Sequence, residues 1–395
     1  MDRPERMLRN LDAIKPSGTM AISEKVRALK REGRNVIHFG QGDPDFETPD
    51  HIKQAAIQAL KENVTHYGDS RGNVELRQAI SEKLLRENHI EADPASEIIV
   101  TPGGKHAVFC SILALIEPGE GVMFFDPAWV SYEPMVRIAE GIPIRVPLHT
   151  EKDGFVFPAE LLDELSDKKT RLLILNSPHN PTGKVFAEEE IESIASWALK
   201  SNAYVLTDEV YEKIIFDPHQ HRSIAALPGM KERTVTVNAF SKSFAMTGWR
   251  LGYLAGPKKI VNRINKVHQH CATCTCTFIQ KAGIEALKGP QDFIPRMVRE
   301  YEKRRNFVLD GLHRMKGIDC AVPQGTFYIF PNISATGLSS LKFGERLLDE
   351  TGVAVTPGVG FGESYDDFVR IAYTNSMAEI QEALDRMAAF FAKIM

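Results

Sequence analysis

The clearest indication of the fold lies in residues 97–116, which have the sequence EIIVTPGGKHAVFCSILALI. The run Glu97–Thr101 is apolar and has the length of a buried strand. Pro102-Gly103-Gly104 ends this strand, and a helical pattern then continues to about Ile116. A strand that turns directly into a helix is typical of α/β proteins, so the segment predicts that fold class.

The same alternation continues along the chain. Further apolar runs of strand length are Val122–Phe125, Arg171–Leu175, Ala203–Thr207 and Thr234–Asn238. Helical patterns such as Ala187–Lys200 lie between them. Strands joined through helices are usually parallel, so we expect a mostly parallel sheet with helices on both faces.

The pattern changes near Gly289-Pro290, which suggests a second domain. Beyond this point we expect a long charged helix over about residues 292–316, short strands at 325–331 and 368–373, and a terminal helix. The first 45 residues hold a helix at about 20–32 and a strand at 36–39, and fit neither pattern. We therefore predict an N-terminal arm (1–45) that packs with a small C-terminal α+β domain (290–395), and a large domain (46–289).

The composition is that of an ordinary globular enzyme. Of 395 residues, 43% are apolar and 25% charged, and the net charge is −4, which disfavours a nucleic-acid partner. We interpret the charged run Arg296–Arg305 as a solvated helix face. The longest apolar run, near Ala107–Ile116, is too short to span a bilayer, and residues 1–10 lack the apolar core of a secretion signal. The five cysteines, an odd number, favour a reducing compartment, so we expect a cytoplasmic enzyme without a membrane partner.

Polar residues follow each predicted strand at its carboxyl end. They are Gly103-Gly104-Lys105, Asp126-Pro127-Ala128-Trp129, the run 176–183 (NSPHNPTG), Asp208-Glu209-Val210-Tyr211, and Ser241-Lys242. Ligands of parallel α/β proteins bind at this edge of the sheet, so we expect these groups to form one site.

This set of groups suits pyridoxal 5′-phosphate (PLP). A lysine amine can form a Schiff base with its aldehyde, and an aspartate can keep its pyridine nitrogen protonated. A helix that begins at glycine offers free N–H groups to the phosphate. An aromatic ring such as that of Trp129 can stack on the cofactor.

The combined order of three motifs resembles the class I aminotransferases of the fold-type-I PLP enzymes. The motifs are Asn180-Pro181-Thr182-Gly183, Asp208-Glu209-Val210-Tyr211, and the run 241–253 with the sequence SKSFAMTGWRLGY. The similarity extends from about Lys15 to the C-terminus and is greatest to the bacterial and archaeal aspartate (aspartate/prephenate) aminotransferases. It implies the fold of that family and PLP as cofactor.

The resemblance also implies roles for the residues around the cofactor ring. Lys242 would hold PLP as a Schiff base and later move a proton between substrate and cofactor. Asp208 would pair with the pyridine nitrogen, and Tyr211 and Asn180 would hydrogen-bond the ring 3-oxygen. Trp129 would stack on the ring.

Further roles concern the phosphate and the substrate. The phosphate would be held by Arg250, by the loop Gly103-Gly104-Lys105, by Ser241, and by Tyr67 of the neighbouring subunit, so that a homodimer with shared sites is expected. Arg370 would bind the substrate α-carboxylate together with the backbone of Gly42. Lys105 would either reach a distal carboxylate of the substrate, or face solvent or the phosphate.

Two positions depart from the family pattern. Ala239 stands where the family often has Gly or Ser, so Ser241 would supply the missing hydroxyl contact. His179 stands where relatives often have Asn, and we expect it to alter the polarity of the pocket without changing the reaction class.

A cluster of possible metal ligands offers a different interpretation. His268, His270, Cys271, Cys274 and Cys276 lie close together, and Cys271 and Cys274 have the spacing of zinc ligands. A structural zinc site usually has a second ligand pair, which is not visible, so we favour cysteines packed in the core and expect no metal.

We therefore predict transamination by a ping-pong mechanism between an L-amino acid and a 2-oxo acid. Glutamate with 2-oxoglutarate is the expected pair, and aspartate or aromatic amino acids are further donors. The alternatives are a PLP-dependent lyase on the same scaffold, of the C–S or aminocyclopropane type, and a non-catalytic regulator. The presence of the whole residue set disfavours the regulator.

Overall fold

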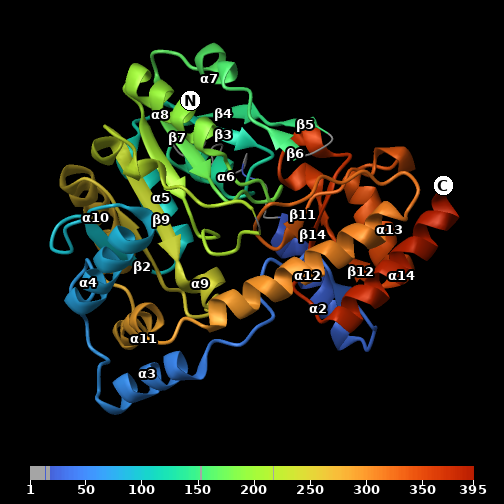
Figure 1. Cartoon of the computed structure of the whole chain (residues 1–395), viewed down its shortest axis with the longest axis horizontal. Coiled ribbons are helices and arrows are strands. Elements are labelled where there is room, and N and C mark those ends of the chain that lie inside the picture. Colours follow the sequence, from blue (N-terminus) through green and yellow to red (C-terminus); the bar gives the residue numbers. More distant parts are fainter. Residues whose placement is uncertain (1–13, 15–17, 152–153, 217) are drawn as a thin grey trace, which may run out of the picture.

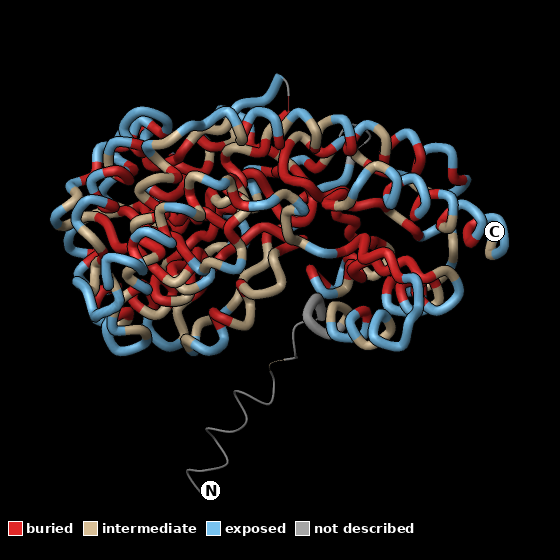
Figure 2. The backbone as a smooth tube through the Cα atoms, turned by 90° about the horizontal axis from the view of Figure 1, so that it is seen from below, coloured by how far each residue is buried: buried red, intermediate tan, exposed pale blue. Residues whose placement is uncertain are grey.

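The computed structural model describes residues 14, 18–151, 154–216 and 218–395. A sheet covered by helices forms one part of the molecule, and the C-terminal helices form the other (Figure 1). The long helix α12 (Phe293–His313) runs from the first part into the second. Buried residues fill the interior of both parts (Figure 2).

The central sheet has seven strands, and their order begins with β2-β10-β9-β8 and continues with β7-β3-β4. Their bounds are β2 (Ile98–Thr101), β10 (Gly252–Ala255), β9 (Thr234–Ala239), β8 (Tyr204–Asp208), β7 (Thr170–Asn176), β3 (Gly121–Asp126) and β4 (Ile142–Pro147). Strand β10 pairs antiparallel with both neighbours, and the other pairings are parallel. The predicted α/β fold with a mostly parallel sheet is confirmed.

The sequence analysis missed strands β10 and β4. Strand β10 has only four residues and follows directly on a loop of the lysine motif. Strand β4 contains Pro143 and Pro147 and lies at the edge of the sheet, where prolines are tolerated but weaken the sequence signal.

Helices cover both faces of this sheet because successive strand residues point to opposite sides. Phe124 packs with α5 (Gly104–Leu115) and α10 (Lys258–Ala272), whereas Phe125 packs with α8 (Glu188–Ser201). The other helices of this part are α3 (Asp50–Lys61), α4 (Val74–Lys83), α6 (Tyr132–Ile138), α7 (Glu160–Leu165), α9 (Phe240–Ser243) and α11 (Thr277–Lys288). A small hairpin is formed by β5 (His149–Glu151) and β6 (Gly154–Val156).

The C-terminal part combines α12 with α13 (Ser340–Thr351), α14 (Met377–Ile394) and a small sheet. Its strands are β11 (Tyr328–Ile329), β14 (Val369–Ala372) and β13 (Thr356–Pro357). The N-terminal segment packs here: after α2 (Gly18–Arg31), strand β1 (Ile37–His38) pairs in parallel with β12 (Val353–Ala354). This packing supports the predicted N-terminal arm, and the exact three-part division stays a prediction.

The interpretation of Arg296–Arg305 as a solvated face is wrong for two residues. Arg304 is buried and donates from Nη1 to both carboxylate oxygens of Asp45 at 2.8 Å. Arg305 is buried as well, and its Nη1 donates to the Pro323 carbonyl at 3.1 Å. Both lie on the inward face of α12, one turn after the buried Tyr301. Among the described residues, no helix combines the length and apolar character needed to cross a membrane.

Candidate active site

The carboxyl ends of β7, β8 and β9 meet at one edge of the sheet. The register places Asn176 beside Asp208, and Asp208 beside Val237. Strand β9 ends at Ala239 and turns at once into the short helix α9, which carries Lys242. The predicted residues after these strands are therefore brought together by parallel pairing alone.

The Lys242 side chain contacts residues from three different segments of the chain. Its Nζ donates a hydrogen bond of 2.6 Å to the Gly42 carbonyl oxygen. It also lies 5.9 Å from the Tyr211 ring centroid and 5.6 Å from that of Phe327. Burial of the amine lowers its pKa to about 8, although Asp43 acts in the opposite direction. A lysine with such a pKa reaches its nucleophilic neutral form near physiological pH.

Asp208 is buried at the end of β8. Its Oδ2 accepts a 2.8 Å hydrogen bond from the Tyr132 hydroxyl, and its Oδ1 accepts a longer one of 3.4 Å from the Val210 N–H. Burial raises the pKa of Asp208 to about 6. Such a carboxylate gains from a nearby positive charge. Sequence reasoning missed Tyr132, because it lies in an ordinary helical pattern three residues after Trp129.

Arg370, on β14, is buried at the same place. Its Nη1 donates to Asn180 Oδ1 at 3.0 Å, and its Nη2 donates to the Gly40 carbonyl oxygen at 2.9 Å. Its Nε is buried without a partner, and among the described residues no carboxylate lies within ion-pair distance of it. A buried guanidinium that lacks an anion is suited to bind one.

Glycines bring the start of α5 close to Arg250. Gly103 precedes the helix with φ +82°, and a Cβ at this position would lie only 2.5 Å from Arg250 Nη2. The first N–H groups of a helix have no acceptor within the helix, so they are free for an anion. Arg250 and the N-terminus of α5, with Gly104 and Lys105, thus form a cationic cradle.

Lys105 lies beside this cradle and over Trp129. Its Nζ is 4.9 Å from the centroid of the Trp129 ring, which itself packs edge-on against Tyr132 at 5.2 Å. Burial and the charge of Arg250 lower the pKa of Lys105. Trp129 therefore contacts Lys105 of the cradle on one side and Tyr132, the hydrogen-bond partner of Asp208, on the other.

Tyr328 of β11 is a second residue that the sequence analysis missed. Its hydroxyl lies 2.9 Å from that of Tyr211, and its ring centroid lies 4.2 Å from the guanidinium carbon of Arg370. A Cβ at Gly42 would collide with the Tyr328 hydroxyl. No local motif marks Tyr328, because only the tertiary contact of β11 with the turn after β8 brings it here. Gly42 itself contacts Lys242, whereas Gly40 contacts Arg370.

Three predicted positions lie apart from these contacts. Tyr67 is 88% exposed, far more than other large apolar side chains of the described residues. Ser241 is buried on α9. His179 is buried too, with its Nδ1 2.8 Å from the Thr182 hydroxyl and its ring edge-on to Phe186, and burial lowers its pKa to about 3.

The expectation that the cysteine cluster is packed in the core is wrong. Cys271 and Cys276 are exposed and Cys274 is half-buried, because they lie at the end of α10 and in the turn before α11. His268 is buried instead, and its Nδ1 lies 2.9 Å from His106 Nε2.

A family model described as aminotransferase class I and II matches residues 34–387. The chain belongs to this aminotransferase family. The aspartate aminotransferase of Pyrococcus abyssi is 44% identical over 379 residues, 95% of this chain and 96% of that protein. The aromatic-amino-acid aminotransferase 2 of Thermococcus litoralis is 41% identical, with the same coverage of both chains. The structure of the aspartate aminotransferase from Thermus thermophilus with maleate has a TM-score of 0.92 at 38% identity, and covers 96% of this chain and 98% of that one.

These similarities confirm the predicted family, fold and reaction class: the protein is a PLP-dependent aminotransferase. The residues present fit the cofactor. Burial lowers the pKa of Lys242 to about 8, the Asp208 carboxylate forms no ion pair among the described residues, and a Cβ at Gly103 would fill the space beside Arg250.

The lowered pKa of Lys242 predicts how the enzyme without PLP takes up its cofactor. Only the neutral amine attacks an aldehyde, so the association rate of PLP should rise with pH and level off above about 8. Stopped-flow absorbance over pH 6–11 measures this rate, and Nα-acetyl-lysine is the control, with a midpoint near the ordinary value of 10.5. A protein midpoint equal to that of the control would contradict the environment described for Lys242.

Proposed function

We propose that this aminotransferase accepts glutamate and 2-oxoglutarate as one substrate pair, and takes aspartate or aromatic amino acids as further donors. The observation that carries the proposal is the presence of two separate cations, Arg370 in the floor of the site and Lys105 above Trp129. Two cations suit the two carboxylates of a dicarboxylic amino acid. The relatives named for aspartate and for aromatic amino acids, and the relative studied with maleate, support the same range.

Arg370 binds the α-carboxylate that all amino-acid substrates share. Its guanidinium is held in place by Asn180 and the Gly40 carbonyl, and by the rings of Tyr328 and Phe361 at 4.2 and 4.9 Å. A planar guanidinium offers paired donors that match a carboxylate. The buried guanidinium of Arg370 is costly without an anion, and the substrate carboxylate offsets this cost when it binds.

When bound, PLP supplies an electron sink that makes the Cα proton of the amino acid acidic. Lys242 takes this proton from the substrate and delivers it to the cofactor. Its lowered pKa allows the amine to act as a base near neutral pH. Gly42, as the hydrogen-bond acceptor of Lys242 Nζ, orients the amine within the site.

The residues around the ring hold and tune the cofactor. Asp208 would pair with the pyridine nitrogen and stabilise its proton, and Trp129 would stack on the ring. Tyr211 and Asn180 would donate to the ring 3-oxygen. Burial raises the pKa of Tyr211 well above its usual value, so that its hydroxyl remains protonated and able to donate.

The phosphate anchors the cofactor in the cationic cradle. Arg250, the N–H groups of Gly104 and Lys105 at the start of α5, and Ser241 supply the donors, whereas the Gly103 N–H already donates to the Thr101 carbonyl at 2.7 Å. The similarity to aminotransferases favours amino transfer over the lyase alternative, which gains no support from the relatives found.

Replacing Lys105 by Met tests the proposed substrates. The substitution keeps the side-chain length and removes the charge, so kcat/KM for glutamate and aspartate should fall. The fall should correspond to a loss of about 1.5–3 kcal/mol of transition-state stabilisation, the range for one hydrogen bond to a charged group. The values for alanine and phenylalanine should stay within about threefold of the parent enzyme. An equal fall in kcat/KM for all four donors would mean that the Lys105 side chain binds the phosphate. An unchanged kcat/KM would mean that it binds neither the phosphate nor the substrate.

We further propose that the enzyme is a cytoplasmic homodimer with shared sites. Five cysteines occur as free thiols, which is typical of a reducing compartment. Tyr67 exposes 88% of its surface in the single chain, which is unusual for a tyrosine and fits a contact with a second subunit. In the dimer its hydroxyl reaches the phosphate of the neighbouring site.

Subunit exchange tests whether Tyr67 acts on the partner's site. Lys242→Ala should be inactive, and Tyr67→Phe should be weakened. A mixed dimer has one site that combines an intact Lys242 with an intact Tyr67 from the other chain, so activity should rise as the two variants exchange. Exchange is followed independently by mass spectrometry of tagged chains. If mixed dimers form and the activity only averages that of the parents, Tyr67 serves its own chain or none.

A further inference from the structure

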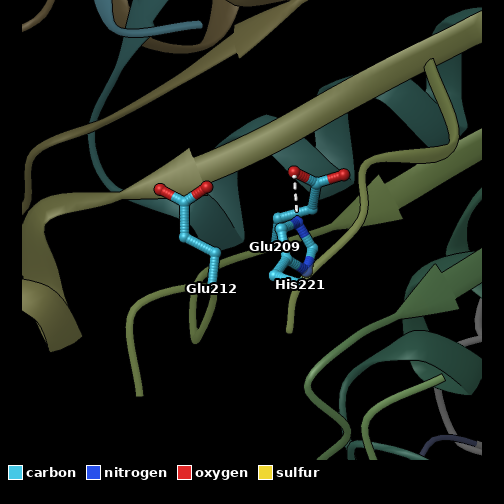
Figure 3. Close-up of side chains that lie close together, drawn as sticks. All are labelled: Glu209, Glu212 and His221. Atoms are coloured by element: carbon cyan, nitrogen blue, oxygen red, sulfur yellow. Dashed lines mark ion pairs between the residues drawn. The ribbon is translucent and has the colours of Figure 1, made fainter. Parts of the chain in front are cut away.

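The turn that follows β8 sends its side chains to two different environments. Asp208 and Tyr211 contribute to the proposed PLP site, where they contact Tyr132 and Tyr328. Glu209 and Glu212 have other partners, away from this site, and both are buried; Glu209 is 0% exposed. Figure 3 shows these two glutamates close together. The turn itself, residues 209–213, is neither helix nor strand, and it is closed by a backbone hydrogen bond of 3.0 Å from the Glu212 N–H to the Glu209 carbonyl.

Glu209 is held by hydrogen bonds on both carboxylate oxygens. Its Oε2 accepts from Ser223 Oγ at 2.7 Å and from Asn88 Nδ2 at 3.2 Å, and lies 3.0 Å from His221 Nε2. Its Oε1 accepts from the Thr207 hydroxyl at 3.2 Å. These contacts on both oxygens hold the carboxylate in one orientation.

A metal ion is the first explanation that this cluster suggests. Ligand atoms of Glu209, Glu212 and His221 lie within 4.8 Å of one another. However, the ammonium of Lys83 already forms an ion pair with Glu212 and donates to Asn88 Oδ1 at 2.7 Å. Burial alone would raise the pKa of Glu212, but Lys83, His221 and Lys213 lower it to about 2. The chain thus supplies its own cation, and we assign no metal here.

Asn88 connects the members of the network. It ends the π-helix η1 (Leu84–Asn88), which continues α4. Its Nδ2 lies within hydrogen-bond distance of Glu209 and of Glu212, at 2.8 Å from the latter, and of Ser223 at 2.8 Å. Single π turns inside helices occur often at functional sites, where they redirect a side chain. Here the π turn places Asn88 against Glu209 and Glu212 of the turn that follows Asp208.

The network lies one peptide away from Asp208. The Glu209 N–H donates to the Val237 carbonyl at 2.9 Å, and Asn176 Nδ2 donates to the Asp208 carbonyl at 2.9 Å. Both polar groups of the peptide that joins Asp208 to Glu209 are therefore held by neighbouring strands, its N–H by β9 and its carbonyl by a side chain of β7. The side chain of Glu209 adds contacts with Ser223, Asn88 and Thr207. Burial is the main cause of the raised pKa of Asp208, and the charge of Glu209 adds to it.

We propose that Glu209 is a positioning residue for Asp208: through its contacts with Asn88, Ser223 and His221, it holds the turn so that the Asp208 carboxylate meets the ring nitrogen of PLP. This inference rests on the proposed role of Asp208. The buried charge of Glu209 next to that carboxylate also favours the protonated ring nitrogen.

Binding of two matched ligands tests the proposal without an activity measurement. One ligand is PLP, and the other is its analogue with C–H in place of the ring nitrogen; both retain aldehyde and phosphate. Glu209→Gln keeps the shape of the side chain and removes its charge. The dissociation constant of PLP from the enzyme stripped of cofactor should rise about tenfold, the size of one charge-assisted hydrogen bond, and that of the analogue should not change.

The matched control is Glu87→Gln. Glu87 lies at the outer side of the same network, where its carboxylate pairs with Lys213 at 2.6 Å. The same chemical change at this position should leave the affinity for both ligands unaltered. Ser223→Ala replaces Glu209→Gln in this test if the glutamine variant does not fold. It removes one donor to Glu209, so the dissociation constant of PLP should rise about threefold and that of the analogue should not change.

Two results would overturn the inference. Equal weakening of PLP and the analogue by Glu209→Gln would mean a general structural role, and unchanged binding of PLP would mean no role. Asp208→Ala separates these from a failure of the proposed function. It should weaken PLP selectively as well, and if it does not, the assignment of Asp208 to the ring nitrogen is wrong.

Discussion

The site depends on the parallel pairing of β7, β8 and β9. Because the three strands run in one direction and in a fixed register, the residues that follow them lie at one edge of the sheet. Asp208 is the last residue of β8, Lys242 lies on α9 directly after β9, and Asn180 follows β7. The second part of the molecule then contributes Arg370 and Tyr328 from its own small sheet. The site thus lies where the two parts meet, and neither part contains all of it.

Burial of charge gives this site its chemistry. Burial lowers the pKa of Lys242 to about 8 and raises that of Asp208 to about 6, so both groups titrate close to the physiological range. The buried guanidinium of Arg370 donates to an amide oxygen and a carbonyl, and no carboxylate of the described residues pairs with it. In each case the folded chain bears a desolvation cost, which cofactor or substrate offsets on binding.

The sequence predicted those features that depend on local patterns. Strands β2, β3, β7, β8 and β9 were expected from apolar runs, and the cofactor family from motifs that directly follow them. Tyr132 and Tyr328 were missed because their roles depend on tertiary contacts with Asp208 and Tyr211. The burial of Arg304 was missed for the same reason, since its partner Asp45 lies far away in the sequence. Long-range pairs of this kind leave no periodic signal in the chain.

The central claim is that Lys242 carries the cofactor. Reduction of the PLP-loaded enzyme with borohydride fixes a Schiff base as a stable secondary amine, and peptide mass spectrometry then locates it. The account predicts that the pyridoxyl group is found on the peptide that contains Lys242, and that Lys242→Ala acquires no label at a matched PLP concentration. A pyridoxyl group on Lys105 or another lysine, with Lys242 unmodified, would contradict it.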